Sequence, residues 1–208
     1  MPKLLVIESA IEDDASKTRA LAGVFVDAWR SRGPEFEVVT RDLAAEPLPH
    51  LTQRAQHWPE RLRGGAKLDP SVDELQQQLI NELVSADALL IGAPMYNYSM
   101  AATLKTWIDL IHVPGVTTPF DISTQPLAGR PAVIITAQGA PTEERTSEFV
   151  TGPLREIFGE ALGMEVSVVG VARTLADMVP ELGVEEANAE FAWAEAEARR
   201  LATALPGS

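Results

Sequence analysis

Five short strand-like segments alternate with helix-like segments along this chain, and this alternation limits its possible folds more than any other feature. The segments span residues 4–7, 36–39, 88–91, 131–136 and 166–169. Most are continuous apolar runs, which is typical of parallel strands that are buried on both faces. The pattern predicts an α/β fold of three layers, with helices covering both faces of a parallel sheet. Right-handed crossovers favour a doubly wound, five-stranded sheet of order 2-1-3-4-5, with strands numbered along the chain.

Helix signals fall between these strands. Ser71 and Glu74 predict a capping box at the start of a helix that ends near Ala86. Pro153 fits the first turn of a later helix, which Gly163 would end. The spacing of apolar residues predicts the remaining helices, over about 16–30 and 184–204 and around the buried stripe Leu104, Trp107, Ile108 and Ile111.

The composition favours one globular domain over residues 1–208. The chain is 208 residues long, 46% of them hydrophobic, and shows no repeat or linker; we interpret 43–70 as an elaborated loop. The net charge of −13 disfavours nucleic acid and anionic membranes as partners. There is no cysteine, which excludes disulfides and thiolate metal sites within the chain. Without a signal-peptide pattern at Met1-Pro2-Lys3 or a membrane-spanning apolar run, we expect a cytoplasmic protein.

Three connecting segments follow the first, third and fourth strands, and they should meet at one edge of the sheet. They span residues 9–18, 94–100 and 136–140. Ligands of open α/β sheets bind at the carboxyl ends of the strands. The first segment brings Ser16, Lys17 and Thr18 to a helix N-terminus, which suits a phosphate group.

The second and third segments suit a flat heterocycle. Pro94-Met95-Tyr96-Asn97-Tyr98 offers aromatic rings and backbone amides, and Gly139 permits a close approach of the backbone. A phosphate pocket and a planar-ring pocket at one edge predict a mononucleotide such as FMN. Each signal has a simpler alternative. Ser16 can serve as an N-cap without binding a ligand, and Lys17 can be a solvated charge. The two tyrosines can pack at the rim of the sheet, and Gly139 can be an ordinary turn residue. The acidic residues 12–14 would also repel a phosphate.

The motifs together resemble the FMN-dependent NADH azoreductases, which are also described as NADH:quinone oxidoreductases. The resemblance rests first on the specific block Pro94-Met95-Tyr96-Asn97-Tyr98 and on Leu104-Lys105-Thr106-Trp107-Ile108-Asp109 after it. Further matches run in order along most of the chain. They are Val26-Asp27-Ala28-Trp29-Arg30, Arg41-Asp42-Leu43-Ala44, Pro114-Gly115-Val116-Thr117 and Val150-Thr151-Gly152-Pro153-Leu154.

The resemblance implies a flavodoxin-like fold, non-covalent FMN and a homodimer with two sites at the subunit interface. Met95, Tyr96, Asn97 and Tyr98, beside Pro94, would line the flavin ring. Ser16, Lys17 and Thr18 fall on the phosphate-binding positions, and the loop Ala137-Gln138-Gly139-Ala140 falls on a ring-binding loop. Ala10, Ala137 and Ala140 replace a serine, a serine and a glycine of the family pattern, with Ser9 one place before the expected serine. We therefore expect contacts through backbone amides, with looser FMN binding that Lys17 partly offsets.

The resemblance also implies a two-electron, ping-pong transfer from NADH or NADPH to a quinone or azo compound, with Phe120 near the substrate. No catalytic side chain is expected, because the flavin carries the chemistry. No metal is expected, since His50, His57 and His112 show no ligand or triad spacing. Two alternatives remain open: an electron-shuttle module that binds FMN without NAD(P)H turnover, which the acidic charge would suit, and a protein that has lost its flavin.

Overall fold

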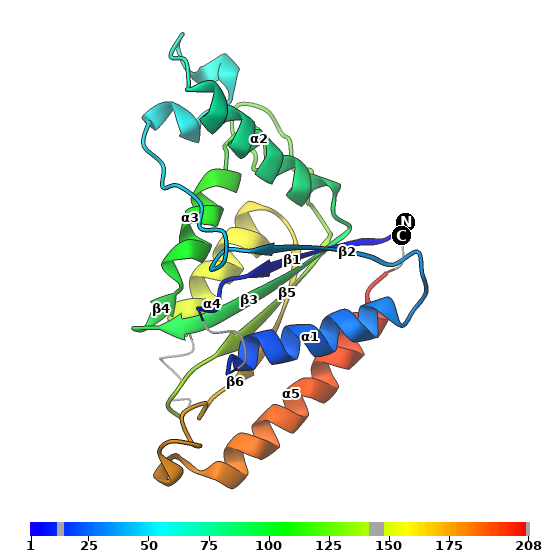
Figure 1. Ribbon diagram of the computed structural model, residues 1–208. Coiled ribbons are helices and arrows are strands. Elements are labelled where there is room, and N and C mark those ends of the chain that lie inside the picture. Colours follow the sequence, from blue (N-terminus) through cyan, green and yellow to red (C-terminus); the bar gives the residue numbers. More distant parts are fainter. Residues whose placement is uncertain (12–14, 142–147, 207–208) are drawn as a thin grey trace.

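A parallel sheet forms the centre of the protein (Figure 1). The computed structural model describes residues 1–11, 15–141 and 148–206, so the acidic residues 12–14 lie outside the described part. The strand order is β2-β1-β3-β5-β6, which confirms the predicted order because the short strand β4 lies outside this path. The parallel strands are β1 (Lys3–Glu8), β2 (Glu37–Asp42), β3 (Ala88–Tyr96), β5 (Pro131–Ala137) and β6 (Glu165–Val171).

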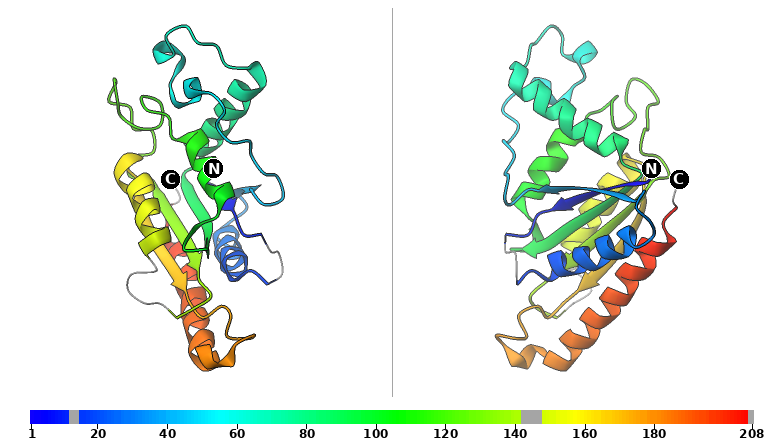
Figure 2. Two further views of the ribbon diagram at one scale, coloured as in Figure 1. Left: turned by 90° about the vertical axis from the view of Figure 1, so that its left-hand side faces the viewer. Right: turned by 45° about the vertical axis from the view of Figure 1, so that its right-hand side comes forward.

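Helices cover both faces of this sheet, as expected for a doubly wound fold (Figure 1, Figure 2). Helices α1 (Lys17–Arg30) and α5 (Val184–Ala204) lie on one face. Helices α2 (Pro70–Ser85), α3 (Ala102–Ile111) and α4 (Glu148–Leu154) lie on the other. In the described part of the chain, no helix has the length and hydrophobicity that crossing a membrane requires.

Side chains of the central strands alternate between two buried clusters. In β1, Leu4 and Val6 point towards α1 and α5, whereas Leu5 and Ile7 point towards α2, α3 and α4. Both faces of the strand are therefore apolar, which explains why its sequence shows no alternation with polar residues. The helices add large aromatic side chains to both clusters, among them Trp29 from α1 and Trp107 from α3, both fully buried.

The start of α2 differs from the prediction. Asp69 is the N-cap, and its side chain accepts hydrogen bonds from the Ser71 N–H (2.9 Å) and the Ser71 hydroxyl (2.6 Å). The predicted capping box of Ser71 and Glu74 is therefore wrong. Pro70 occupies the first helical position, where its fixed φ suits the helix and its missing N–H costs nothing, so the helix starts two residues earlier than a Ser71 cap implies.

The prediction that Pro153 opens a helix is also wrong. Helix α4 already begins at Glu148, and Pro153 lies inside it. Proline cannot donate the backbone hydrogen bond that a helix interior needs. The chain continues as a π-helix over Arg155–Ala161, and the Leu162 N–H still bonds the Ile157 carbonyl at a spacing of five residues (3.0 Å). Gly163 then ends the helix with φ +74°, as expected.

The elaborated loop contains two short 3₁₀ helices, Arg54–His57 and Glu60–Leu62, and extends beyond the sheet (Figure 1, cyan). It is fastened to the loop that follows α3. The Arg61 guanidinium bonds the Asp121 carboxylate (2.7 and 3.0 Å) and the Gly115 carbonyl (2.8 Å). The rings of Trp58 and Phe120 lie 5.3 Å apart. Trp58 therefore anchors its own loop against the same chain.

A buried carboxyl group lies at the end of β1. Glu8 is 7% exposed and pairs in register with Gly92 of β3, where an added Cβ would lie only 2.6 Å from the Glu8 Oε2. Burial raises the pKa of Glu8 to about 7, against a smaller lowering by Arg19 and a further raising by Asp42. The charged form of Glu8 is thus disfavoured by the folded state.

This burial predicts a pH dependence of stability. Because the folded pKa lies above the unfolded one, Glu8 destabilises the fold progressively as pH rises from about 4.5 to 7, and by a constant amount above that. Between pH 5 and pH 8, the free energy of unfolding should fall by about 2–3 kcal/mol more in the parent protein than in Glu8→Gln. Urea titration at the two pH values measures this difference.

The control is Glu37→Gln, which removes an exposed carboxylate from the neighbouring strand β2 and should leave the difference unchanged. Equal pH dependence in Glu8→Gln and the parent would show that the Glu8 carboxyl group is solvated in the folded protein.

Candidate functional site

A tight hairpin forms one wall of the candidate site. We predicted a loop over 94–100, but β3 continues through Pro94 and Met95 to Tyr96 and then pairs with the antiparallel strand β4 (Ser99–Met100). Asn97 and Tyr98 form the two-residue turn with φ of +49° and +66°. Left-handed φ at both turn positions matches the twist of a hairpin. It is unusual for tyrosine, and it turns the exposed Tyr98 ring away from the sheet core.

The N-terminus of α1 forms the opposite wall. Ser16 is the N-cap, and its Oγ accepts the Arg19 N–H (3.2 Å). The hydroxyl groups of Ser16 and Thr18 lie 3.0 Å apart, and Thr18 is fully buried. The predicted capping role of Ser16 is confirmed. It does not compete with a ligand role, because the first N–H groups of any helix have no partner within the helix.

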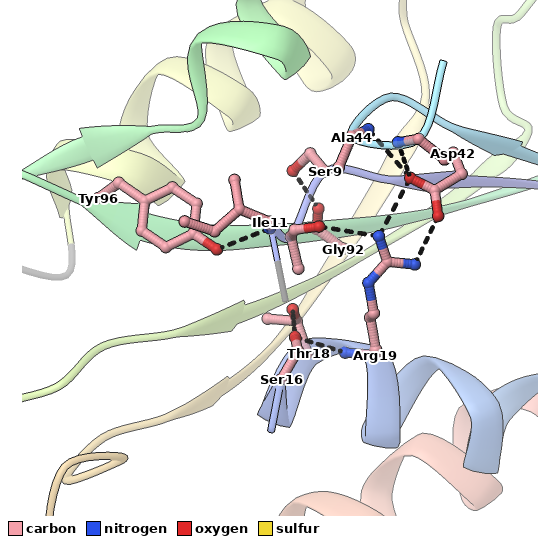
Figure 3. Close-up of polar contacts among 11 residues, drawn as sticks. Ser9, Ile11, Ser16, Thr18, Arg19, Asp42, Ala44, Gly92 and Tyr96 are labelled. Atoms are coloured by element: carbon pink, nitrogen blue, oxygen red, sulfur yellow. Dashed lines mark hydrogen bonds and ion pairs between the residues drawn. The ribbon is translucent and has the colours of Figure 1, made fainter. Parts of the chain in front are cut away.

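Arg19 fixes this helix end against the sheet (Figure 3). Its guanidinium bonds both oxygens of Asp42 at the end of β2 (2.8 and 3.0 Å) and the Ala10 carbonyl after β1 (2.8 Å). The hydrogen bond from Arg19 lowers the pKa of Asp42, helped by the N–H groups of Ala45 and Ala44, while partial burial opposes it. One cation thus joins α1 to the ends of two strands.

Two further hydrogen bonds connect the first loop to β3 (Figure 3). The Ser9 hydroxyl, fully buried, donates to the Gly92 carbonyl (2.6 Å). The Ile11 N–H donates to the Tyr96 hydroxyl (3.0 Å). Ser9 therefore holds β1 and β3 together, and Tyr96 spans from the hairpin to the first loop.

A segment after β6, residues 172–179, closes the third side. The Thr174 N–H bonds the Gln138 carbonyl (3.2 Å), and the Leu175 N–H bonds the Gly139 carbonyl (3.4 Å). A Cβ at Gly139 would lie 2.7 Å from the Leu175 side chain. The Leu175 side chain therefore occupies the space that a side chain at position 139 would need.

These walls enclose a cleft of about 590 Å³ at the carboxyl ends of the strands. Its volume lies within the range of roughly 300–1,000 Å³ that is usual for cofactor sites. The structure brings eight of the predicted residues together along it: Ser16, Lys17, Thr18, Pro94, Met95, Tyr96, Ala137 and Gly139.

The other predicted residues are not among those lining the cleft. Ser9 is fully buried with its hydroxyl on the Gly92 carbonyl, and Asn97 and Tyr98 form the tip of the hairpin. The Gln138 side-chain amide donates within its own loop to the carbonyls of Ala140 and Pro141 (3.2 Å each). Phe120 lines a separate hollow of about 500 Å³ with Trp58. Roles of these residues in cofactor or substrate binding stay predictions.

The sequence reasoning missed the wall that residues after β6 supply. The missed residues after β6 are Thr174, Leu175, Asp177 and Met178, together with Phe191 of α5. Ile11, Ala15 and Ala20, around the start of α1, also line the cleft without having been singled out. One available signal was that the turn after the fifth strand opens at the same edge as the other three. Lys17 also differs from expectation, because its ammonium lies 3.7 Å from Asp177 Oδ2 and 5.5 Å from the centroid of the Phe191 ring.

The chemistry of the lining residues fits a phosphorylated planar ring. Hydroxyl groups, backbone N–H groups and a lysine gather at the α1 end, where a helix N-terminus favours an anion. Pro94, Met95 and Tyr96 present apolar and aromatic surface from β3. In the described part of the chain, no cluster of His, Asp or Glu could hold a metal ion.

Comparison with known proteins agrees with this geometry. Residues 2–198 match a family model described as flavodoxin-like fold. A protein of Kineococcus radiotolerans named FMN-dependent NADH:quinone oxidoreductase is 43% identical, and the match covers 99% of this chain and 100% of that protein. A protein of the same name from Streptomyces avermitilis is 35% identical, over 88% of this chain and 86% of that protein.

A solved structure shares the fold at lower identity. It is an FMN-dependent NADH-azoreductase from Bacillus anthracis in complex with FMN, with a TM-score of 0.79 and 18% identity, covering 97% of this chain and 98% of that one. At this identity the likeness concerns the fold alone. The family match and the two relatives cover most or all of the chain. This chain therefore belongs to the FMN-dependent NADH:quinone oxidoreductases, a family of flavodoxin-like fold.

Proposed function

We propose that this chain is an FMN-dependent oxidoreductase that passes two electrons from NADH or NADPH to a quinone or an azo compound in a ping-pong reaction. The names of its relatives support FMN, NADH and quinone. The observation that carries the proposal is the cleft itself, in which an anion-binding helix N-terminus and an aromatic hairpin belong to one space.

The chain's own residues would bind and orient the cofactor. Ser16, Lys17 and Thr18 would hold the phosphate group at the start of α1. Pro94, Met95 and Tyr96 would lie along the ring, with Asn97 and Tyr98 at its edge. Backbone groups of the loop 137–140 would contact the ring, and Ser9 would support the site by holding β1 to β3.

The bound flavin would supply the electron-carrying chemistry, and the protein would supply orientation and electrostatics. Backbone N–H groups near Asn97 and Gly139 would stabilise negative charge on a reduced ring, because fixed dipoles need no reorganisation when charge develops. In this proposal no side chain acts as an acid or base.

The activity is tested with the purified protein, FMN, NADH and benzoquinone. We expect NADH oxidation that depends on both FMN and quinone, with parallel double-reciprocal plots at several quinone concentrations. Intersecting lines would contradict the ping-pong order. FMN binding without oxidation of either NADH or NADPH would instead favour an electron-shuttle module, which the net charge of −13 would suit.

The hairpin turn gives a second test. Asn97→Val places a β-branched residue at φ +49°, which should lower the free energy of unfolding by about 1–2 kcal/mol and reduce the FMN content. The control Asn97→Gly accepts this φ and should retain flavin. Flavin absorbance per protein after purification measures the content. Equal flavin content in the two variants would show that the hairpin does not contribute to the proposed ring site.

The homodimer and the cytoplasmic location belong to this proposal. Several large side chains are exposed in the single chain, among them Tyr98, Phe120 and Phe149 at 71%, 63% and 51%. Burial of such a surface by a second copy would be favourable. Light scattering during size-exclusion chromatography should give twice the chain mass, and a monomer mass at micromolar concentration would contradict the dimer.

A further inference from the structure

The Lys17 side chain already has an anionic partner within the cleft. Its Nζ lies 3.7 Å from Asp177 Oδ2. Both residues line the cleft, Lys17 from the first turn of α1 and Asp177 from the segment after β6. The Lys17 side chain is 38% exposed and that of Asp177 is 73% exposed, so both are accessible to a ligand. A phosphate group at this end of the cleft would meet a lysine whose positive charge is partly neutralised by the Asp177 carboxylate.

The backbone, rather than the ion pair, sets the position of Asp177. Its segment bonds the 138–139 backbone through Thr174 and Leu175. On the other side, Glu190 of α5 accepts from the Ala172 N–H (3.0 Å) and from Arg173 Nε (3.1 Å). Loss of the Asp177 charge should therefore leave this wall in place.

The ion pair is too exposed to be a structural necessity. Exposed pairs contribute about 0–1 kcal/mol to stability. Lys17 also has a second neighbour, because its ammonium lies over the Phe191 ring at 5.5 Å from the centroid. The ammonium can thus move from the carboxylate to a bound phosphate at small cost and stay beside the ring.

We propose that Asp177 is a specificity-determining residue that limits the preference of the cleft for phosphorylated over unphosphorylated flavin, because its carboxylate competes with the phosphate group for Lys17. This inference rests on the proposed function. It concerns two residues of this chain, and it assigns to the segment after β6 a role in the choice of cofactor. Asp177 acts through Lys17 and is therefore a positioning residue.

The test compares FMN with riboflavin, which lacks the phosphate group, by quenching of flavin fluorescence in flavin-free protein. Asp177→Asn should lower the Kd for FMN by about threefold at low ionic strength, and by less as salt screens the charges. The Kd for riboflavin should not change. Lys17→Met should raise the Kd for FMN and leave that for riboflavin unchanged.

The double variant separates competition for Lys17 from simple repulsion. In the Lys17→Met background, Asp177→Asn should change the Kd for FMN by less than about 1.5-fold. Glu181→Gln is the matched control, because it removes an exposed acidic charge from the nearby 3₁₀ helix Pro180–Leu182 and should alter neither Kd.

Three outcomes would overturn the proposal: an equal gain with and without Lys17, equal shifts for FMN and riboflavin, or weaker FMN binding in Asp177→Asn. The first would make Asp177 a repelling charge, and the others would make it a structural part of the wall. If the parent protein bound neither flavin, the proposed function itself would fail, and that result is distinct from all three.

Discussion

Parallel pairing brings the carboxyl ends of β1, β3, β5 and β6 to one edge of the sheet, and the cleft depends on this constraint. In an antiparallel sheet, half of these ends would lie on the opposite side. Here the segments that follow all four strands reach the same space, although more than 160 residues of sequence separate the first from the last. The register is held by apolar side chains on both faces, so the position of the cleft is a consequence of core packing.

Polar contacts within the chain then fix the walls of the cleft. Arg19 joins α1 to Asp42 and to the Ala10 carbonyl, and Tyr96 joins the hairpin to Ile11. The segment after β6 is bonded to the loop at Gln138 and Gly139. Each contact connects elements that are distant in sequence. Because these contacts lie within the chain, they reduce the freedom that the walls would lose when a ligand binds.

The periodic parts of the fold were predictable from the sequence. The limits of α1 and α5 and the buried stripe of α3 follow from apolar spacing, which reports burial directly. The strand order follows from the alternation of strands and helices and the right-handedness of their crossovers. The start of α2 was not predicted, because Asp69 and Ser71 are both good capping residues and only the position of Pro70 decides between them. The π-helix after Pro153 was missed because the core fixes the path of the helix and overrides its local signals.

The candidate site was predictable where a motif and a strand end coincide. Ser16, Lys17 and Thr18 reach the cleft, as do Pro94, Met95 and Tyr96. Asp177 and Phe191 were not found, because they come from a segment and a helix whose sequences carry no motif. They meet Lys17 only in the folded chain, because both are distant from it in sequence. Gly139 illustrates the same limit, since the sequence indicates that a side chain is absent but not which neighbour uses the space.

The left-handed pair at Asn97 and Tyr98 depends on strand pairing on either side of the turn. The strain of this turn is balanced by the pairing of Met95 with Met100 and of Tyr96 with Ser99, which belongs to the polypeptide. The chain therefore fixes the shape of its own hairpin, whatever occupies the cleft.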